Sequence, residues 1–366
     1  MARYRIAWMP GDGIGKEVME AARIVLDKMA FDAEYVPAGI GWEFWRTEGD
    51  PLPQRTLDLM KGTDCALFGA ITSKGKDVSQ KELAPELQGK GLTYRSPIVR
   101  MRQTLDLYTC LRPCRAYPGN SLNYKEGIDI TVFRENTEGM YIGVEFAQVP
   151  EEFYVVPGVE KLPRDAAISF RAITPGGSER IVRAAFEYAV KHGKSKVTAV
   201  HKANVLRQTD GVFMDAARKV AAEYPSIEFD NANIDAMGMW LLKNPLNYQV
   251  IVTTNLFGDI ISDLCAQMVG GLGFGCSGNI GDDYAVFEPT HGSAPKYDGL
   301  YKVNPIATIL AAKMMLEWLG EADMAKQLEN AVAAVIAEGQ VRTYDMGGDH
   351  GTLEMAEAIA GRLVNW

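Results

Sequence analysis

Two aspartates that stand four residues apart form the most informative feature of the sequence. They are Asp259 and Asp263, within the segment 255–264, NLFGDIISDL. The apolar run 250–252 predicts a buried strand, and the helix that follows is expected to begin near Gly258. On that helix both carboxylates would share one face and repel each other unless a cation neutralised them. A hard divalent cation prefers carboxylate oxygens, so the pair predicts a metal site.

The alternative for this pair is an exposed acidic helix face. It fits poorly because apolar side chains surround the two carboxylates, namely Ile260, Ile261 and Leu264. A metal-dependent phosphate-ester enzyme would also use paired aspartates. That interpretation leaves the other motifs of the chain without a role.

Three arginines at the edges of apolar segments suggest a site for anions. Arg102, Arg112 and Arg134 lie in the contexts VRMRQ, CLRP and FRENTEG. Guanidinium groups bind carboxylates through two parallel hydrogen bonds and stay charged at any working pH. Any one of the three could form an ordinary surface ion pair. Three of them, in a chain with an acidic metal site, predict a polycarboxylate substrate.

Candidate proton-transfer groups follow the arginines along the chain. Lys202 and Asn204 end an apolar strand, and a lysine there beside a metal and arginines is expected in its neutral form, from which it could take a proton. Tyr141 would be the complementary acid, although its spacing alone also suits core packing. Asp235 is a plausible third metal ligand or, equally, a helix cap.

Glycine-rich segments indicate where a nucleotide could bind. The segments 270–275, GGLGFG, and 288–297, EPTHGSAPKY, allow close backbone approach to a ligand and offer His291, Lys296 and Tyr297 for stacking and charge. An earlier turn, residues 10–15, has the sequence PGDGIG. Its glycines do not have the Rossmann spacing, so we interpret it as a tight turn between strand and helix near a ligand.

The surrounding pattern alternates strands with helices. Strands are expected at 4–9, 65–70, 128–133, 196–200 and 249–254, and helices at 179–191, 211–223, 305–319 and 324–338, after a first helix that follows the PGDGIG turn. This alternation predicts an α/β protein with a largely parallel sheet. The segment 148–164 has no clear period and is expected to be a loop or an arm that reaches a second subunit.

Composition limits the class of protein. The chain has 366 residues, 47% of them hydrophobic, and a net charge of −9, which argues against binding to nucleic acid or to an anionic membrane surface. Because the first residues, MARYRI, include no long apolar stretch, we expect no secretory signal, and we expect no membrane span because no segment is apolar over the length needed to cross a bilayer. The five cysteines have no C-x-x-C spacing, which suggests reduced thiols in a cytoplasmic protein.

Taken together, these segments resemble the β-decarboxylating dehydrogenases, which include the isocitrate, isopropylmalate, homoisocitrate, and tartrate or D-malate dehydrogenases. The resemblance runs from the PGDGIG turn almost to the C-terminus. It implies the isocitrate/isopropylmalate dehydrogenase-like α/β fold in a homodimer whose two subunits share each active site. The large cofactor-binding domain would be discontinuous, made of residues 1–105 and 257–366. Residues 106–256 would form a smaller central α/β domain that binds substrate and carries a dimerisation arm.

The resemblance also implies a role for each candidate residue. Tyr141 would act as the acid, and Lys202 of the partner subunit would assist removal of the hydroxyl proton. The substrate-binding set would be Ser96, Arg102, Arg112, Arg134 and Asn204. The ligands of Mg²⁺ or Mn²⁺ would be Asp259 and Asp263 with Asp235 from the partner subunit. The cofactor loop would comprise His291, Gly292, Ser293, Ala294, Lys296, Tyr297, Asn304 and Tyr344.

Substrate and cofactor choice follow from details of the same comparison. Tyr108 and Ser96 look most similar to isocitrate dehydrogenases, with isocitrate converted to 2-oxoglutarate, whereas the SPIV segment 96–99 looks similar to homoisocitrate dehydrogenases. We therefore expect isocitrate as the substrate, with homoisocitrate, isopropylmalate, tartrate and D-malate as alternatives. Lys296, Tyr297 and Tyr344 resemble the pattern of NADP enzymes, while NAD enzymes usually have Asp-Ile in place of Lys296-Tyr297. We therefore expect a modest preference for NADP over NAD.

A non-catalytic regulatory subunit is the competing class. Such subunits typically lack the tyrosine, the lysine or an aspartate of the site. All of these residues are present here. The segment 73–92 matches no pattern of the family, and its role is open.

Overall fold

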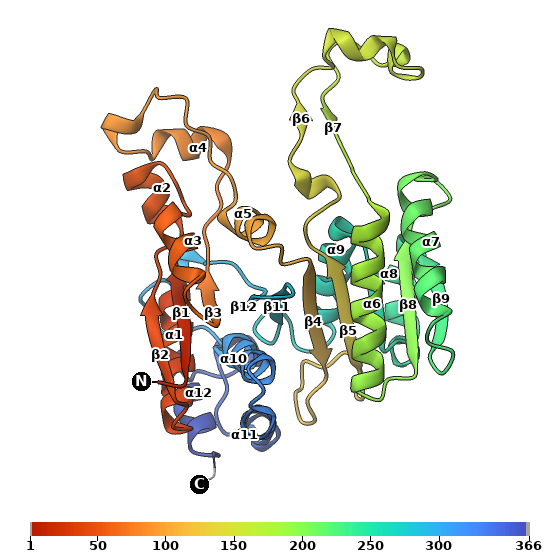
Figure 1. Ribbon diagram of the computed structural model, residues 1–366. Helices are drawn as coiled ribbons and strands as arrows, with labels where there is room; N and C mark the ends of the chain where they lie inside the picture. The colour runs from red at the N-terminus through yellow and green to blue at the C-terminus, as the bar shows by residue number, and fades with distance from the viewer. Residues whose placement is uncertain (1, 364–366) are drawn as a thin grey trace.

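Ten strands pair into one sheet that runs through the whole molecule, in a computed structural model that describes residues 2–363 (Figure 1). In spatial order the strands are β2 (Ala33–Pro37), β1 (Tyr4–Gly11), β3 (Cys65–Ala70), β12 (Ala285–Pro289), β11 (Cys276–Ile280), β4 (Thr109–Arg115), β5 (Asp129–Glu135), β10 (Val250–Thr253), β8 (Lys196–His201) and β9 (Glu228–Asn233). The mixed α/β fold confirms the predicted fold class.

The sheet is less parallel than the alternation of elements predicted. Both flanks are parallel, as expected where helices connect the strands. At the centre, β11 is antiparallel to β12 and to β4, and β4 is antiparallel to β5. The prediction of a largely parallel sheet was therefore wrong at the centre, because the chain crosses twice there between the two halves of the sheet and reverses direction.

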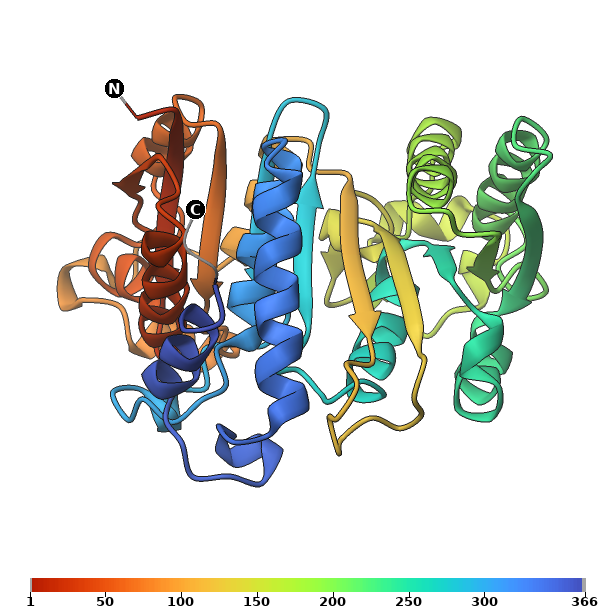
Figure 2. The same ribbon diagram turned by 90° about the horizontal axis from the view of Figure 1, so that it is seen from below.

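Helices cover both faces of the half that contains β1 and β3. Alternate residues of a strand face opposite sides of a sheet. Accordingly, Cys65 and Leu67 pack against one cluster of buried side chains, and Ala66 and Phe68 pack against another. The first cluster includes α1 (Gly15–Lys28), α10 (Ile306–Trp318), α11 (Ala322–Glu338) and α12 (Thr352–Ala360), and the second includes α3 (Gln54–Met60) and α5 (Pro97–Thr104). Figure 2 shows α10 and α11 packed along one face of the sheet.

The other half is built in the same way. Val250 and Val252 of β10 face α6 (Pro175–Lys191) and α7 (Thr209–Ala221), whereas Ile251 faces α8 (Ile234–Lys243) and α9 (Asn255–Gln267). The expected division at residue 257 stays a prediction. Helix α9 packs on β5 and β4, which belong to the predicted smaller domain. On this packing, the smaller domain would include α9 and would therefore end after residue 257.

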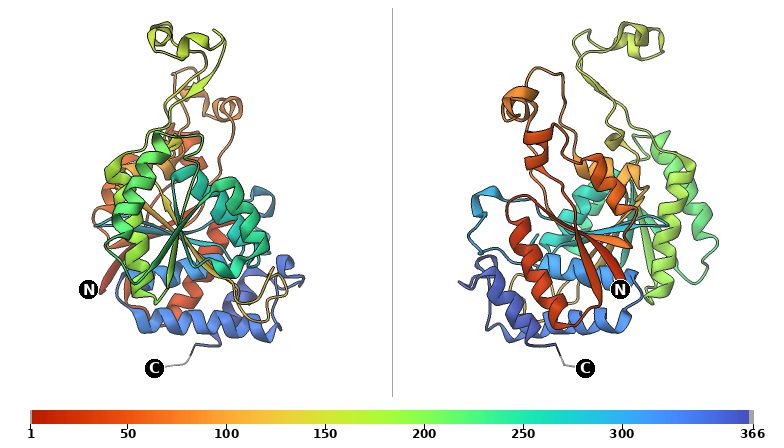
Figure 3. Two further views of the ribbon diagram at one scale, coloured as in Figure 1. Left: turned by 90° about the vertical axis from the view of Figure 1, so that its right-hand side faces the viewer. Right: turned by 60° about the vertical axis from the view of Figure 1, so that its left-hand side comes forward.

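Two segments project from the same side of the molecule (Figures 1 and 3). One contains α2 (Trp42–Glu48) and α4 (Lys76–Lys81). The other is an arm, residues 144–170, with the short strands β6 (Glu145–Phe146) and β7 (Ile168–Ser169) in its stem. Rings of Phe146, Phe153 and Phe170 pack edge to face within this arm. Between residues 2 and 363 no helix is both long and apolar enough to cross a membrane.

Candidate active site

The paired aspartates lie on α9, which begins at Asn255 rather than near Gly258. Gly258 is buried in the first turn, and a Cβ there would lie 2.6 Å from Cβ of Arg134 on β5. A side chain at this position would push the helix off the strand, so glycine allows α9 to lie directly on Arg134. The four-residue spacing then turns both Asp259 and Asp263 toward the arginines, as the sequence predicted.

Arg134 and Arg112 hold these carboxylates from the adjacent strands. Arg134 donates to Asp259 through Nη1 and to Oδ1 of Asn255 through Nε and Nη2, at 2.9 and 2.7 Å. Arg112 Nη1 lies 3.3 Å from Asp259 Oδ1 and 3.2 Å from Asp263 Oδ1. Both arginines are buried, and the partly exposed aspartates are their partners, so the site is a compact group of opposite charges.

The third predicted arginine is held apart from the aspartates. Arg102, in the last turn of α5, donates to Glu288 of β12 at 3.0 Å, and both side chains are more than nine-tenths buried. Nε of Arg102 and Nε of Arg112 are buried without a hydrogen-bond partner in the described structure. Buried donors of this kind normally have a partner. Their presence fits a site that takes a carboxylate-bearing ligand.

The arginines change the acidity of the aspartates. Burial alone would raise the pKa of Asp259, but Arg134 and Arg112 outweigh it and hold that pKa below its usual range. For Asp263 burial wins over Arg112, and the pKa is raised. Asp259 therefore stays ionised. Asp263 has 56% of its side chain exposed, and a cation that approaches from solvent would favour its ionised form.

Tyr141 also contacts this group. It lies in the short turn Met140–Ile142, and its hydroxyl donates to Oδ2 of Asp259 at 2.7 Å. The guanidinium of Arg134 lies 4.9 Å from the centre of its ring. Burial and the bond to Asp259 raise the pKa of Tyr141. The phenol is therefore protonated at neutral pH and able to serve as an acid.

Two of the remaining predicted residues form a separate pair within one chain. Nζ of Lys202, just after β8, lies 2.5 Å from Oδ1 of Asp235. Asp235 sits in the first turn of α8, where Asn233 occupies the cap position, and the hydrogen bond from Lys202 lowers its pKa. Asn204 is exposed beside them. Among residues 2–363 no three His, Cys, Asp or Glu side chains are grouped to hold a metal ion.

The predicted cofactor loop borders a cavity of about 620 Å³. His291, Gly292, Ala294, Asn304 and Tyr344 line it, together with the glycine-rich segment 270–273. Nε2 of His291 is buried without a partner in the described structure, and burial lowers the pKa of this imidazole. Nδ1 of His291 lies 3.0 Å from the carbonyl oxygen of Gly292 and would donate to it, so in the neutral ring Nε2 is free to accept a hydrogen bond, for example from the amino group of an adenine.

Two tyrosines and two lysines stand beside this cavity. The rings of Tyr297 and Tyr344 are 5.4 Å apart, Lys296 lies 4.8 Å from the first ring and Lys302 lies 5.2 Å from the second. Cations above phenol rings leave their N–H donors free for a phosphate. Lys302 was not among the predicted site residues, although this lysine stands only two residues before Asn304 of the predicted loop.

The PGDGIG turn is a tight turn between β1 and α1, as predicted, and it packs against the predicted cofactor loop. Gly13 has a φ of +51°, and a Cβ there would lie 2.3 Å from the carbonyl oxygen of Ser293. Ile14 donates its N–H to that same oxygen at 3.0 Å. The Ser293 hydroxyl is bonded to the hydroxyl of Thr72 at 2.6 Å. Ser96 occupies the N-cap position of α5, but its hydroxyl makes no capping hydrogen bond.

Three residues that orient the arginines were missed by the sequence analysis. Asn255 binds Arg134, Ser262 Oγ accepts from Arg112 at 2.7 Å, and Glu288 pairs with Arg102. Asn255 and Ser262 lie within the ten-residue aspartate motif itself. Their helical spacing from Asp259, four and three residues, is the signal that could have placed them on the same face.

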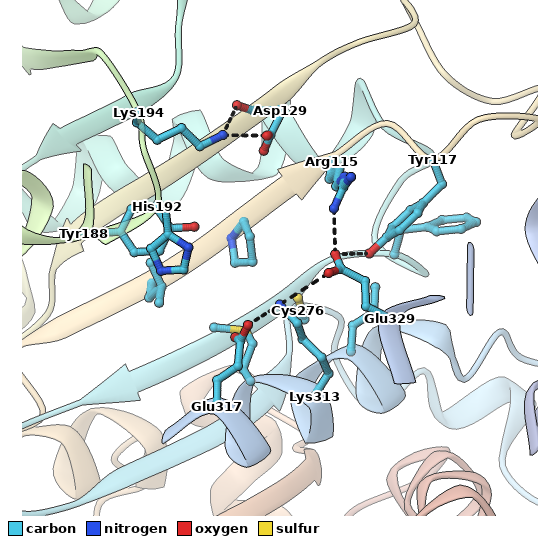
Figure 4. A pocket seen from close by; sticks show the side chains of 15 residues that line it. Arg115, Tyr117, Asp129, Tyr188, His192, Lys194, Cys276, Lys313, Glu317 and Glu329 are labelled. Atoms are coloured by element: carbon cyan, nitrogen blue, oxygen red, sulfur yellow. Dashed lines mark hydrogen bonds and ion pairs between the residues drawn. The ribbon is translucent and has the colours of Figure 1, made fainter. Parts of the chain in front are cut away.

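A second cavity, of about 250 Å³, lies on the opposite face of β4 (Figure 4). Leu111, Pro113 and Arg115 line it, whereas Arg112 faces α9. Its cations are all ion-paired: Arg115 with Glu329, Lys194 with Asp129, and Lys313 with Glu317. The first pair joins β4 to α11, the second joins the loop after α6 to β5, and the third lies within α10. The arginine and aspartate group is therefore the candidate active site.

Known proteins match the chain along its whole length. The profile of the Isocitrate/isopropylmalate dehydrogenase family matches residues 5–359. The chain is 42% identical to the 3-isopropylmalate dehydrogenase of Methanothermobacter thermautotrophicus, over 99% of both chains. It is 41% identical to the isocitrate/homoisocitrate dehydrogenase of Thermus thermophilus, over 98% of both. The structure of isocitrate dehydrogenase from Methylococcus capsulatus aligns with a TM-score of 0.87, at 39% identity and over 98% of this chain and 99% of that one.

These matches cover both halves of the sheet and the segments that carry the candidate residues. They confirm the resemblance inferred from the sequence motifs. The chain belongs to the isocitrate/isopropylmalate dehydrogenase family and is an oxidoreductase.

Proposed function

We propose that the protein oxidises a 2-hydroxy acid that carries a carboxylate on C3 and releases that carboxylate as CO₂, with NADP and a divalent cation. The observation that carries the proposal is the group formed by Arg112, Arg134, Tyr141 and Asp259. Within it, two guanidinium groups that could bind substrate carboxylates and a phenol that could act as an acid all contact Asp259, a carboxylate that could hold a metal.

The donor set fits Mg²⁺ or Mn²⁺. Asp259 and Asp263 offer only oxygen atoms and stand one helical turn apart, and Asp263 is open to solvent. A cation bound there would polarise the oxygen on C2 and stabilise the charge that develops as CO₂ departs. NADP bound along the His291 loop would accept the hydride from C2.

The residues of the chain supply binding and proton transfer. Arg102, Arg112 and Arg134 would bind the substrate carboxylates and orient C2 and C3. Lys202 would take the hydroxyl proton as the hydride leaves C2. After decarboxylation, Tyr141 would protonate C3.

Lys202 and Asp235 would act in the site of a second subunit. Their pairing with each other, apart from Asp259, supports this arrangement. Asp235 lies on α8 and Asp259 lies on α9, and both helices also expose large apolar side chains. These are Met239 and Leu242 on α8 and Ile260 on α9. Exposed apolar patches of this kind are typical of subunit interfaces. The arm, in which Val155 is 85% exposed, would add to the contact.

The leading candidate substrates are isocitrate, homoisocitrate and 3-isopropylmalate. The free hydroxyl of Ser96 at the start of α5 favours a distal carboxylate, as in isocitrate or homoisocitrate. The 42% identity to 3-isopropylmalate dehydrogenases favours an apolar substituent instead. D-malate and tartrate complete the candidates.

A direct assay separates these candidates. The purified chain would be given each acid with Mg²⁺ or Mn²⁺ and with NADP or NAD, and both cofactor reduction and CO₂ release would be measured. We expect stoichiometric CO₂ and reduced cofactor with one acid. Absence of turnover with every acid would contradict the proposed function and would support a regulatory subunit.

A further inference from the structure

The stem of the arm ends in a buried ion pair that reaches the backbone of Lys202. Arg171 follows β7, and its Nη1 lies 2.6 Å from Oδ1 of Asp210. Asp210 is fully buried in the first turn of α7. Its other oxygen, Oδ2, accepts the backbone N–H of Lys202 at 2.5 Å. One carboxylate therefore joins the stem to the loop that carries Lys202.

The same guanidinium also holds the start of α9. Arg171 donates to the hydroxyl of Thr209 at 2.5 Å and to the hydroxyl of Thr254, the cap residue of α9, at 3.2 Å. It also lies 5.3 Å from the ring centre of Phe257. Two residues further along the helix stands Asp259. Arg171, which follows the arm stem, thus contacts the start of α7 and the start of α9 at once.

We propose that Arg171 and Asp210 are positioning residues that fix Lys202 and the start of α9 relative to the arm. The inference rests on the proposed function, because it assigns Lys202 to the site of a second subunit and Asp259 to the site of its own. The pair would then link the two active sites of a dimer through the seating of the arm. A buried carboxylate with these two partners is suited to this task, because movement of Arg171 would leave buried charges unpaired and movement of the Lys202 backbone would leave its N–H without an acceptor.

Substitutions can separate the two bonds of Asp210. In Asp210→Asn the amide oxygen can still accept the N–H of Lys202, but the ion pair with Arg171 is lost. Asp210→Ala loses both, Arg171→Met removes the guanidinium, and Arg171→Lys keeps only its charge. Glu223→Gln is the matched control, because it breaks the ion pair between Glu223 and Arg183 near the other end of α7.

We expect kcat to fall about tenfold or more in Asp210→Ala and Arg171→Met, because a misplaced group far from the chemistry slows the reaction more than it weakens binding. KM for the acid and for NADP should change less than about twofold on the same argument. The kcat values of Asp210→Asn and Arg171→Lys should lie between those of these variants and that of the wild type. The kcat of Glu223→Gln should equal that of the wild type. Unchanged kcat in a folded Asp210→Ala or Arg171→Met variant, or a rise in KM alone, would overturn the proposal.

Hydrogen exchange of the segment 200–206 in the full-length variants does not depend on turnover. Exchange should be faster in Arg171→Met and Asp210→Ala than in the wild type and unchanged in Glu223→Gln. Equal exchange in all four proteins would overturn the positioning role even if the enzyme is active. A wild-type chain that turns over no acid would instead contradict the proposed function, and faster exchange in these variants would still support the structural link.

Discussion

The hydroxyl of Tyr141 is bonded to Oδ2 of Asp259 at 2.7 Å, while Arg134 binds the other oxygen of that carboxylate. The proposed acid and a proposed metal ligand are therefore in direct contact. A cation that binds Asp259 would compete for this oxygen. It would free the tyrosine hydroxyl for the substrate.

Replacing Tyr141 with Phe should lower kcat by about 10²- to 10⁴-fold, since this is the usual contribution of a positioned acid. KM should change little because the three arginines remain. Steady-state kinetics with the accepted acid would measure both. Tyr4→Phe is a matched control, because Tyr4 also donates to a carboxylate, that of Glu321 at 2.7 Å, far from the site. Full turnover in Tyr141→Phe would exclude the tyrosine as the acid.

Mg²⁺ or Mn²⁺ should stabilise the folded protein by binding Asp259 and Asp263. At 100 times the dissociation constant, one bound ion adds about 2.7 kcal/mol to the free energy of unfolding. The ion should raise the melting temperature of the wild type and of Asp215→Asn, an exposed control, but not of Asp259→Asn or Asp263→Asn. Turnover should stop in excess EDTA and return with added metal. Undiminished turnover in EDTA would contradict the metal site.

Arg102 should contribute to stability as well as to binding. In Arg102→Met, Glu288 would stay buried without its ion partner, and loss of one partner of a buried pair typically costs about 3–5 kcal/mol. Urea denaturation would measure the loss. The double variant Arg102→Met/Glu288→Gln should regain much of that stability without regaining turnover. Recovery of turnover in the double variant would show that Arg102 does not bind substrate.

Lys296 and Tyr297 should set the choice of cofactor. Replacing them with Asp and Ile should lower kcat/KM for NADP by about 10- to 100-fold, which corresponds to one lost charge-assisted hydrogen bond of about 1.5–3 kcal/mol. The value for NAD should fall less or rise, because an aspartate can bind the free ribose hydroxyls. Lys326→Asp, on the exposed surface of α11, serves as the control. Equal losses for both cofactors would refute the assignment.

Glu17 should make stability fall as the pH rises from about 4 toward neutrality. Its carboxyl is buried on α1 and accepts the N–H of Gly299 at 2.5 Å, and burial raises its pKa. A raised folded pKa means that the folded state binds the proton more tightly than the unfolded state. Stability is therefore lost between the unfolded value, about 4.3, and the folded one.

Glu17→Gln keeps an oxygen for the N–H of Gly299 but does not titrate. The stability of this variant relative to the wild type, measured as the difference in the free energy of unfolding, should therefore increase as the pH rises. Urea denaturation at pH 4 and at pH 7 would measure this difference. A change in the opposite direction would show that folding favours the ionised form of the Glu17 carboxyl over the protonated form.

Local pattern was enough to predict several elements. The strand Cys65–Ala70 was predicted with the limits that the structure has, because a short apolar run that follows the polar segment 61–64 indicates a buried strand. The expected start of α9 was three residues late, since Gly258 looked like a helix boundary but is an interior glycine that allows contact with Arg134. Strand β4, which carries Arg112, was not predicted as a strand because its arginines and proline interrupt any apolar alternation.

The sequence by itself determined that Asp259 and Asp263 share a helix face, because that depends only on the period of the helix. It also determined that the arginines, the tyrosine and the glycine loops are present. Only the tertiary structure decided that Tyr141 meets Asp259, 118 residues further along the chain, and that Lys202 pairs with Asp235 instead. Such contacts depend on which strands pair and in which direction, and the antiparallel centre of the sheet could not be deduced from local periodicity.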